Sequence, residues 1–92
     1  MNVTSDNHNI KNINGANTLI KASHGVVTAV HVMHDSTTGD LVFRNGTTIA
    51  APIEFTIHTQ NPQAYIQLNR RFENGIFVEC TSANAYALVV YK

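Results

Sequence analysis

The sequence is poor in charge. Charged side chains make up 13% of the 92 residues, about half of the roughly 25% that is usual in globular domains. Six Lys and Arg balance six Asp and Glu, so the formal net charge is zero. Nucleic-acid binding needs a basic patch, and the only basic pair, Arg70-Arg71, points to opposite faces of a predicted strand. The composition therefore disfavours a nucleic-acid partner, and the absence of net charge fits a protein that works in an assembled state.

The sequence also lacks the marks of a disulfide-bonded or membrane-bound protein. Cys80 is the only cysteine, which excludes an intramolecular disulfide. Because it shares the phase of Ile76 and Val78, we expect it to be a small buried hydrophobic residue. The first ten residues contain neither a basic nor an apolar segment, and no apolar run approaches the roughly 18 residues that span a membrane. We expect no signal peptide, no membrane partner and synthesis in a cytoplasm.

Short runs of alternating hydrophobicity fill the chain, and none has the period of a long helix. In the clearest run, 53–58, Ile53, Phe55 and Ile57 share one face and polar residues share the other. This pattern is typical of a strand with one face in a core and one in water. Similar runs predict further strands near residues 10–13, 18–22, 26–34, 40–44, 65–72, 76–80 and 85–91.

Three Asn-Gly pairs stand between these runs: Asn14-Gly15, Asn45-Gly46 and Asn74-Gly75. Asn-Gly is the strongest local signal for a tight turn because both residues tolerate positive φ. Strands about ten residues apart with turns between them indicate an all-β sandwich or barrel. We predict one β-sandwich domain of about eight strands, of jelly-roll or Greek-key type, over residues 9–92, after a polar N-terminal arm at residues 1–8.

Two of the predicted strands, 26–34 and 85–91, are apolar on both faces. Only one face of each strand meets the core of a two-layer sandwich. The other face needs a cover, and an uncovered apolar face usually marks an interaction surface. With Leu88 and its in-phase neighbours assigned to the core, the predicted intermolecular interface comprises Val27, Ala29, Met33, Ala87, Val89 and Tyr91. We therefore predict a homo-oligomer.

Residues with metal-binding or catalytic side chains are scattered. A zinc site needs three or four converging ligands, and we predict no metal from the spacing of His8, His24, His31, His34 and His58. The segment His34-Asp35-Ser36 contains the residue types of a hydrolase triad. Neighbours in sequence rarely reach triad geometry, however, and no nucleophile-elbow motif surrounds Ser36. A thiolate at Cys80 is disfavoured by its apolar phase. We predict no enzymatic activity, no catalytic residue and no cofactor.

Aromatic residues leave a second class of function open. Tyr65, Tyr86, Tyr91 and Phe77 are candidates for a platform on which sugar rings stack, although the sequence has no tryptophan and only 8% aromatic residues. Packing in a core or an interface is the alternative for the same residues. A small carbohydrate-binding module is therefore an alternative function.

Two C-terminal segments carry a resemblance to known proteins. The segment 68–78, with Phe72 before the turn Asn74-Gly75, and the closing strand 85–91 resemble the last turn and strand of small virion proteins of tailed bacteriophages. Upstream, residues 25–32 and 39–43 are similar to early core strands of the same proteins, although Arg44 stands where those proteins commonly have Asp. The resemblance covers about residues 15–92 and rests on turn and core residues.

The resemblance implies a non-enzymatic structural role in a phage particle. It points to a capsid decoration, or cement, protein on the capsid surface, made in the cytoplasm of the bacterial host. Its partner would be the lattice of the major capsid protein, and a homotrimer is favoured because decoration proteins often occupy local three-fold positions. A tail, neck or fibre accessory protein of the virion is the alternative within the particle. No catalytic residue comes with this resemblance.

Overall fold

The computed structural model describes residues 8–33, 39–58, 65–83 and 85–92. The predicted arm, apart from His8, lies outside these ranges, as do the predicted turn at residues 35–38 and the predicted break at Asn61-Pro62. Within the described residues the chain forms eight β-strands and no helix, which confirms the all-β prediction. Accordingly, no helix in the described ranges has the length and apolar character to cross a membrane.

The strands lie within a few residues of the predicted runs. They are β1 (Asn9–Asn14), β2 (Thr18–Lys21), β3 (Gly25–Met33), β4 (Asp40–Asn45), β5 (Ile53–His58), β6 (Tyr65–Phe72), β7 (Ile76–Cys80) and β8 (Tyr86–Tyr91). The period of two in hydrophobicity and the Asn, Gly and Ser residues between the runs explain this agreement, because strands alternate faces and these residues favour turns.

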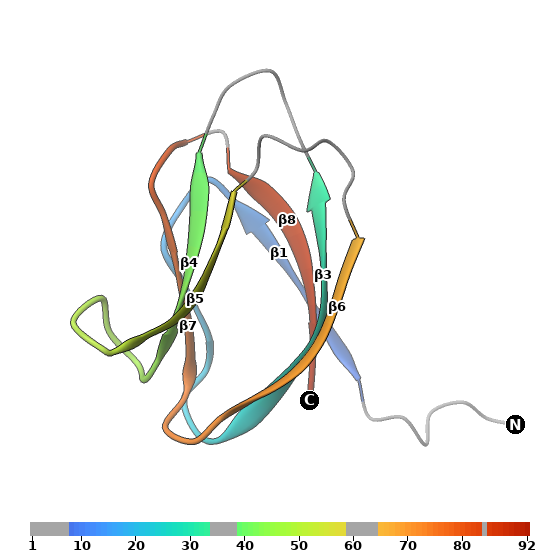
Figure 1. Cartoon of the computed structure of the whole chain (residues 1–92). Helices are drawn as coiled ribbons and strands as arrows, with labels where there is room; N and C mark the ends of the chain where they lie inside the picture. The colour runs from blue at the N-terminus through green and yellow to red at the C-terminus, as the bar shows by residue number, and fades with distance from the viewer. Residues whose placement is uncertain (1–7, 34–38, 59–64, 84) are drawn as a thin grey trace, which may run out of the picture.

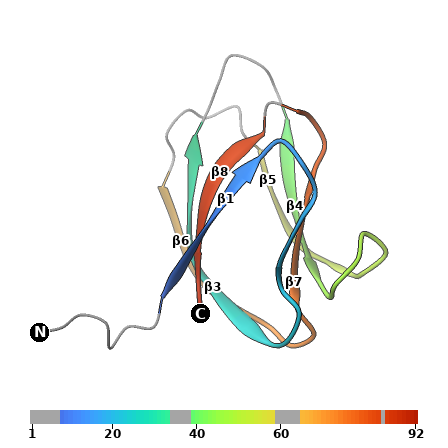
Figure 2. The ribbon, with the colours of Figure 1, turned by 180° about the vertical axis from the view of Figure 1, so that it is seen from behind.

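The eight strands form two antiparallel sheets that pack as a sandwich (Figure 1). The first sheet has the order β1-β8-β3-β6 and the second has the order β2-β7-β4-β5. This is the arrangement of a jelly roll, an eight-stranded double sheet. The chain passes from one sheet to the other between most successive strands, and Figure 2 shows the same two layers from behind. Among the described strands, only β4 and β5 are both neighbours in sequence and hydrogen-bonded partners.

All three Asn-Gly pairs lie at strand ends, but only one of them belongs to a hairpin. Asn45-Gly46 ends β4 and begins the loop that leads to β5 and extends to the side of the sandwich in Figure 1. Asn14-Gly15 and Asn74-Gly75 lie where the chain leaves the first sheet for the second. Gly15 has a φ of 74° and Gly75 a φ of 135°, so these two glycines use the conformational freedom on which the turn prediction rested.

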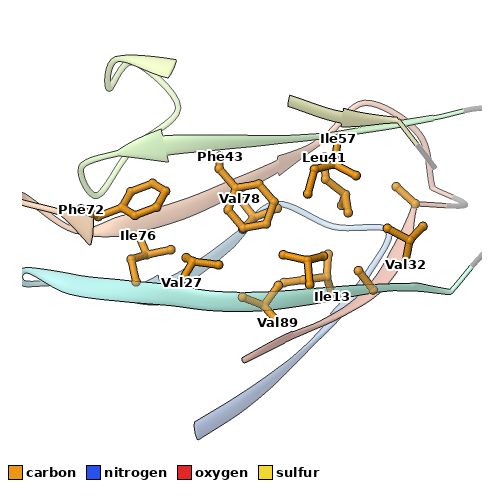
Figure 3. Close-up of a cluster of buried hydrophobic side chains, with 13 residues drawn as sticks. Ile13, Val27, Val32, Leu41, Phe43, Ile57, Phe72, Ile76, Val78 and Val89 are labelled. Atoms are coloured by element: carbon orange, nitrogen blue, oxygen red, sulfur yellow. The ribbon is translucent and has the colours of Figure 1, made fainter. Parts of the chain in front are cut away.

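The core fills the space between the two sheets (Figure 3). Phe43 and Phe55, from β4 and β5, stack with ring centroids 4.7 Å apart. Phe72 of β6 lies 6.5 Å from the ring of Phe43 and 6.0 Å from that of Phe55. Contacts between rings add to the free energy gained from burying their area. The remaining fully buried side chains are mostly branched and aliphatic, and Ala85 and Ala87 contribute the smallest ones.

Candidate binding face

The two outer faces of the sandwich differ in charge. In the second sheet, an ion pair with a 2.8 Å separation joins Arg44 Nη2 on β4 to Glu79 Oε1 on β7. Arg44 Nη1 also donates to the carbonyl oxygen of Ala51, at 2.7 Å. The central strands of the first sheet, β3 and β8, contain no Asp, Glu, Lys or Arg. Along its middle, the outer face of the first sheet therefore carries apolar and neutral polar side chains and no Asp, Glu, Lys or Arg.

Charged side chains of the first sheet lie on its edge strands. Lys11 is on β1, and Arg70 and Arg71 are on β6. Charges on edge strands oppose the pairing of one sheet edge with another. These charges therefore oppose the association of the first sheet through its edges.

Four side chains on this outer face form what we call the apolar patch: Ile10, Met33, Tyr86 and Leu88. Ala87 and Val89 are completely buried between the sheets, so Tyr86 and Leu88 point away from the core. Met33 lies opposite Tyr86 in the register of β3 and β8. Ile10 is 66% exposed and Met33 is 42% exposed, whereas Tyr86 and Leu88 are partly buried.

A hollow of about 490 Å³ adjoins the apolar patch on the same face. Its lining comes from three strands of the first sheet, β3, β6 and β8, and from two residues just outside strands, His8 before β1 and Lys92 after β8: His8, Thr28, Ala29, Tyr65, Gln67, Asn69, Val90 and Lys92. The register of β3 shifts between Val27 and Ala29 against both of its neighbours. This β-bulge leaves an extra residue unpaired and bends the strand, and the hollow lies beside it.

The backbone around the hollow is irregular in a second way. Asn69 has a φ of 53°, and it is the only residue other than glycine with positive φ in the described ranges. Asn tolerates this left-handed conformation better than most residues. The hydroxyl of Thr28 donates to the carbonyl oxygen of Val90 at 3.0 Å, so the bulge is tied to β8 by a side chain.

The predicted interface residues are divided between the core and the surface. Val27, Ala87 and Val89 are fully buried in the core, and Tyr91 packs partly against it. The prediction that these four residues face outward is therefore wrong. Met33 does face outward in the apolar patch, and Ala29, although only 3% exposed, lies in the lining of the hollow.

The error has a physical cause. When both faces of a strand are apolar, alternation alone does not say which face is buried. In β8 Ala87 and Val89 are fully buried between the sheets, while Leu88 points to the opposite face and is only partly buried. In β3 the bulge reverses the phase within the strand, so that Val27 and Val30 both point into the core. Nothing in the sequence marks that bulge.

The histidines are dispersed over the described part of the molecule. His58 Nδ1 lies 2.6 Å from Asp40 Oδ1 at one end of the second sheet. The ring of His31 meets Tyr65 edge-on, with centroids 6.2 Å apart. His8 and His24 are exposed, and His34 lies outside the described residues together with Asp35 and Ser36. Within the described ranges, no group of three or more His, Cys, Asp or Glu side chains is placed to hold a metal ion.

Cys80 is half-buried rather than fully enclosed. Its thiol lies 3.4 Å from the carbonyl oxygen of Ala16, to which it can donate. Burial raises the pKa of the Cys80 thiol, the nearby charge of Glu79 raises it further, and a backbone hydrogen bond from Gly15 partly offsets both. The thiol is therefore a poor nucleophile near neutral pH.

The four aromatic residues proposed as a sugar platform do not meet at one place. Tyr65 and Tyr86 lie on the outer face of the first sheet, Tyr91 packs partly on the core, and Phe77 belongs to the second sheet. Of the four, only Tyr65 lines the hollow. The sequence did not indicate that the amide side chains of Gln67 and Asn69 lie beside Tyr65 in the hollow, because the shape of the sheet there depends on the bulge in β3.

Comparison with known proteins adds no relative to this picture. No family model, no curated protein and no solved structure matches the chain.

Proposed function

We propose that this protein is a non-enzymatic structural component of a phage particle, a decoration protein that binds the assembled lattice of the major capsid protein. The observation that carries the proposal is the outer face of the first sheet, whose central strands have no Asp, Glu, Lys or Arg and which holds the apolar patch of Ile10, Met33, Tyr86 and Leu88. The phage assignment itself rests on the resemblance of residues 15–92 to small virion proteins.

The apolar patch has the chemistry of a protein interface. Burying an exposed aliphatic or aromatic side chain contributes about 1.5–3 kcal/mol, so four such residues supply a modest affinity for each copy. Many copies on a closed shell add their contributions. A ligand that binds only the assembled state shifts the equilibrium towards that state. A small sandwich without chemistry of its own would in this way protect a shell against the pressure of its genome.

The charges on β1 and β6 favour contact through the face of the first sheet over pairing of its edges. In this proposal the apolar patch makes the contact with the capsid lattice, on which the protein stands as a homotrimer. The trimer is favoured by the resemblance and by the local three-fold positions of capsids, and the residues themselves specify no stoichiometry.

Particles that lack the protein provide the test. A decoration role predicts that heads still assemble and package DNA but rupture at a lower temperature than complete particles do. Adding the purified protein back should restore the original rupture temperature. Particles of normal heat stability that have lost adsorption to host cells would contradict decoration and favour a tail or fibre role.

A further inference from the structure

The hollow on the outer face of the first sheet has the size of a ligand site. Its volume of about 490 Å³ falls within the range of about 300–1,000 Å³ that is usual for small-molecule pockets. Its floor contains the apolar side chains of Ala29 and Val90, and its walls carry hydroxyl, amide and amine groups. An apolar floor with a few polar groups around it is the usual composition of a ligand pocket.

One wall of the hollow is a ladder of side chains along the edge strand β6. Tyr65, Gln67 and Asn69 occupy alternate positions of β6 and all line the hollow. Alternate residues of a strand are about 6.8 Å apart on one face, so the ladder spans about two such steps. The amides of Gln67 and Asn69 make no side-chain hydrogen bond to another residue in the described ranges. They are therefore free to bind a ligand.

Tyr65 is the aromatic group of this ladder. Its side chain is exposed, with 65% of the residue surface accessible. The ring of His31 meets it at an interplanar angle of 66°, an edge-on contact that supports the ring. A broad face of an aromatic ring held in this way is a packing surface for the C–H groups of a sugar ring.

The polar groups of the hollow also suit a sugar. A sugar hydroxyl both donates and accepts hydrogen bonds, and a side-chain amide offers both functions in one plane. Among the described residues that line the hollow there is no Asp or Glu, and Lys92 is the one Lys or Arg. Apart from this one amine, the polar groups of the lining are neutral hydroxyl and amide groups, which match a ligand that is rich in hydroxyl groups.

We propose that the hollow binds an uncharged oligosaccharide that lies along β6, with one sugar ring on Tyr65 and hydroxyl groups on the amides of Gln67 and Asn69. This site shares no residue with the apolar patch, but it lies beside it, because Val90 of its lining is paired with Ile10 of the patch. Its binding of a sugar is therefore tested on the free protein. The irregular backbone at Val27–Ala29 and Asn69 is what opens the face at this point.

The test uses the purified full chain and NMR titration with three neutral trisaccharides, namely maltotriose, cellotriose and fully N-acetylated chitotriose, and with trigalacturonate as the charged counterpart. We expect at least one neutral trisaccharide to bind with a Kd of about 0.1–1 mM, as is reasonable for a shallow site. The amide signals that shift should belong to residues 28–29, 65–69 and 90–92. Tyr65→Ala and Gln67→Ala should each raise the Kd about tenfold, because each removes one good contact with the sugar.

Ile53→Ala is the matched control, because Ile53 is 56% exposed on the second sheet, and it should leave the Kd unchanged. The circular-dichroism spectrum of each variant establishes that it is folded. The inference is overturned if wild-type protein binds none of the neutral trisaccharides, if it binds trigalacturonate only, or if Tyr65→Ala binds as well as wild type. No capsid takes part in this experiment, so its failure would leave the proposed decoration role unaffected.

Discussion

Two glycines set the path of the chain between the sheets. At Gly75 an added Cβ would lie 2.6 Å from the carbonyl oxygen of Gly46, and at Gly15 it would collide with the backbone of Ala83. Both residues also have positive φ, which side chains other than Gly, Asn and Asp rarely adopt. The chain therefore needs glycine at both positions to pass from one sheet to the other, for lack of space as well as for the positive φ.

Gly75→Ala should lower the free energy of unfolding by about 1–3 kcal/mol, because the chain must keep a strained φ and also move the Gly46 carbonyl. Urea unfolding followed by circular dichroism measures the change. Ser23→Ala, an exposed position in the connection between β2 and β3, is the control and should change stability by less than about 0.5 kcal/mol. Equal stability of Gly75→Ala and Ser23→Ala would contradict the strained crossing.

Cys80 should react slowly with thiol reagents in the native state. Its raised pKa keeps the thiol protonated near neutral pH, so labelling by a disulfide reagent at pH 8 should be much slower in the folded protein than in urea. Because the pKa is higher in the folded than in the unfolded chain, the stability from the protonated thiol is present below the ordinary pKa of 9.0 and is lost as the pH rises above it. Cys80→Ala should remove this alkaline loss. Equally fast labelling in both states would show that the thiol is not enclosed.

At the scale of the strand, β8 separates what the sequence can predict from what it cannot. Its length and its apolar character on both faces follow from the residues Tyr86–Tyr91. The buried face does not follow from these residues, because it depends on the register that β8 takes with its neighbours. Ala87 and Val89 lie beside the buried Ile13, Val30 and Val32 of β1 and β3 in the same sheet. This register places Leu88 on the outer face.

The same limit applies to β3 and to the connections. The bulge between Val27 and Ala29 changes which alternate residues of β3 point into the core. No residue type in the sequence indicates this bulge. The Asn-Gly pairs predict where the chain turns, but the exchange of sheets at Asn14-Gly15 and Asn74-Gly75 depends on partners far away in the sequence. The fold class was therefore predictable from the sequence. The candidate binding face was not, because the sequence does not say which faces of β3 and β8 are buried.

Aspartate substitutions in β8 should show directly which face of this strand is buried. Val89→Asp places a charge in the core and should cost more than about 4 kcal/mol, a large part of the stability of a small domain. Leu88→Asp places the charge on the outer face, where Leu88 is only partly buried, and should cost less than Val89→Asp, about 1–2 kcal/mol. Thermal unfolding followed by circular dichroism compares the two. Loss of the fold in Leu88→Asp with a stable Val89→Asp would reverse the assignment of the two faces.

At the scale of the whole molecule, the sandwich presents one outer face crossed by the Arg44–Glu79 ion pair and one whose central strands carry no charge. Because of this asymmetry, the proposed apolar contact with a partner would use the outer face of the first sheet. Association through such a face depends on apolar burial and hydrogen bonds rather than on ion pairs.

Binding to the capsid should therefore be nearly insensitive to salt. Raising the ionic strength from about 0.1 M to 1 M shortens the screening length from about 10 Å to 3 Å, which weakens ion pairs but not apolar contacts. Co-sedimentation of the protein with heads should give the same bound fraction across this range. A bound fraction that falls steeply with salt would indicate that the charged edges or the second sheet make the contact.

The most direct test of the docking claim is a binding titration on phage heads that lack the protein. Purified wild type should bind these heads saturably, and Leu88→Asp, folded by circular dichroism, should bind at least about tenfold more weakly. Leu19→Asp, at a 44%-exposed position on the second sheet, should bind like wild type. Heads that take up no wild-type protein, or that take up Leu88→Asp as tightly as wild type, would contradict the proposal that the apolar patch docks this protein on a capsid.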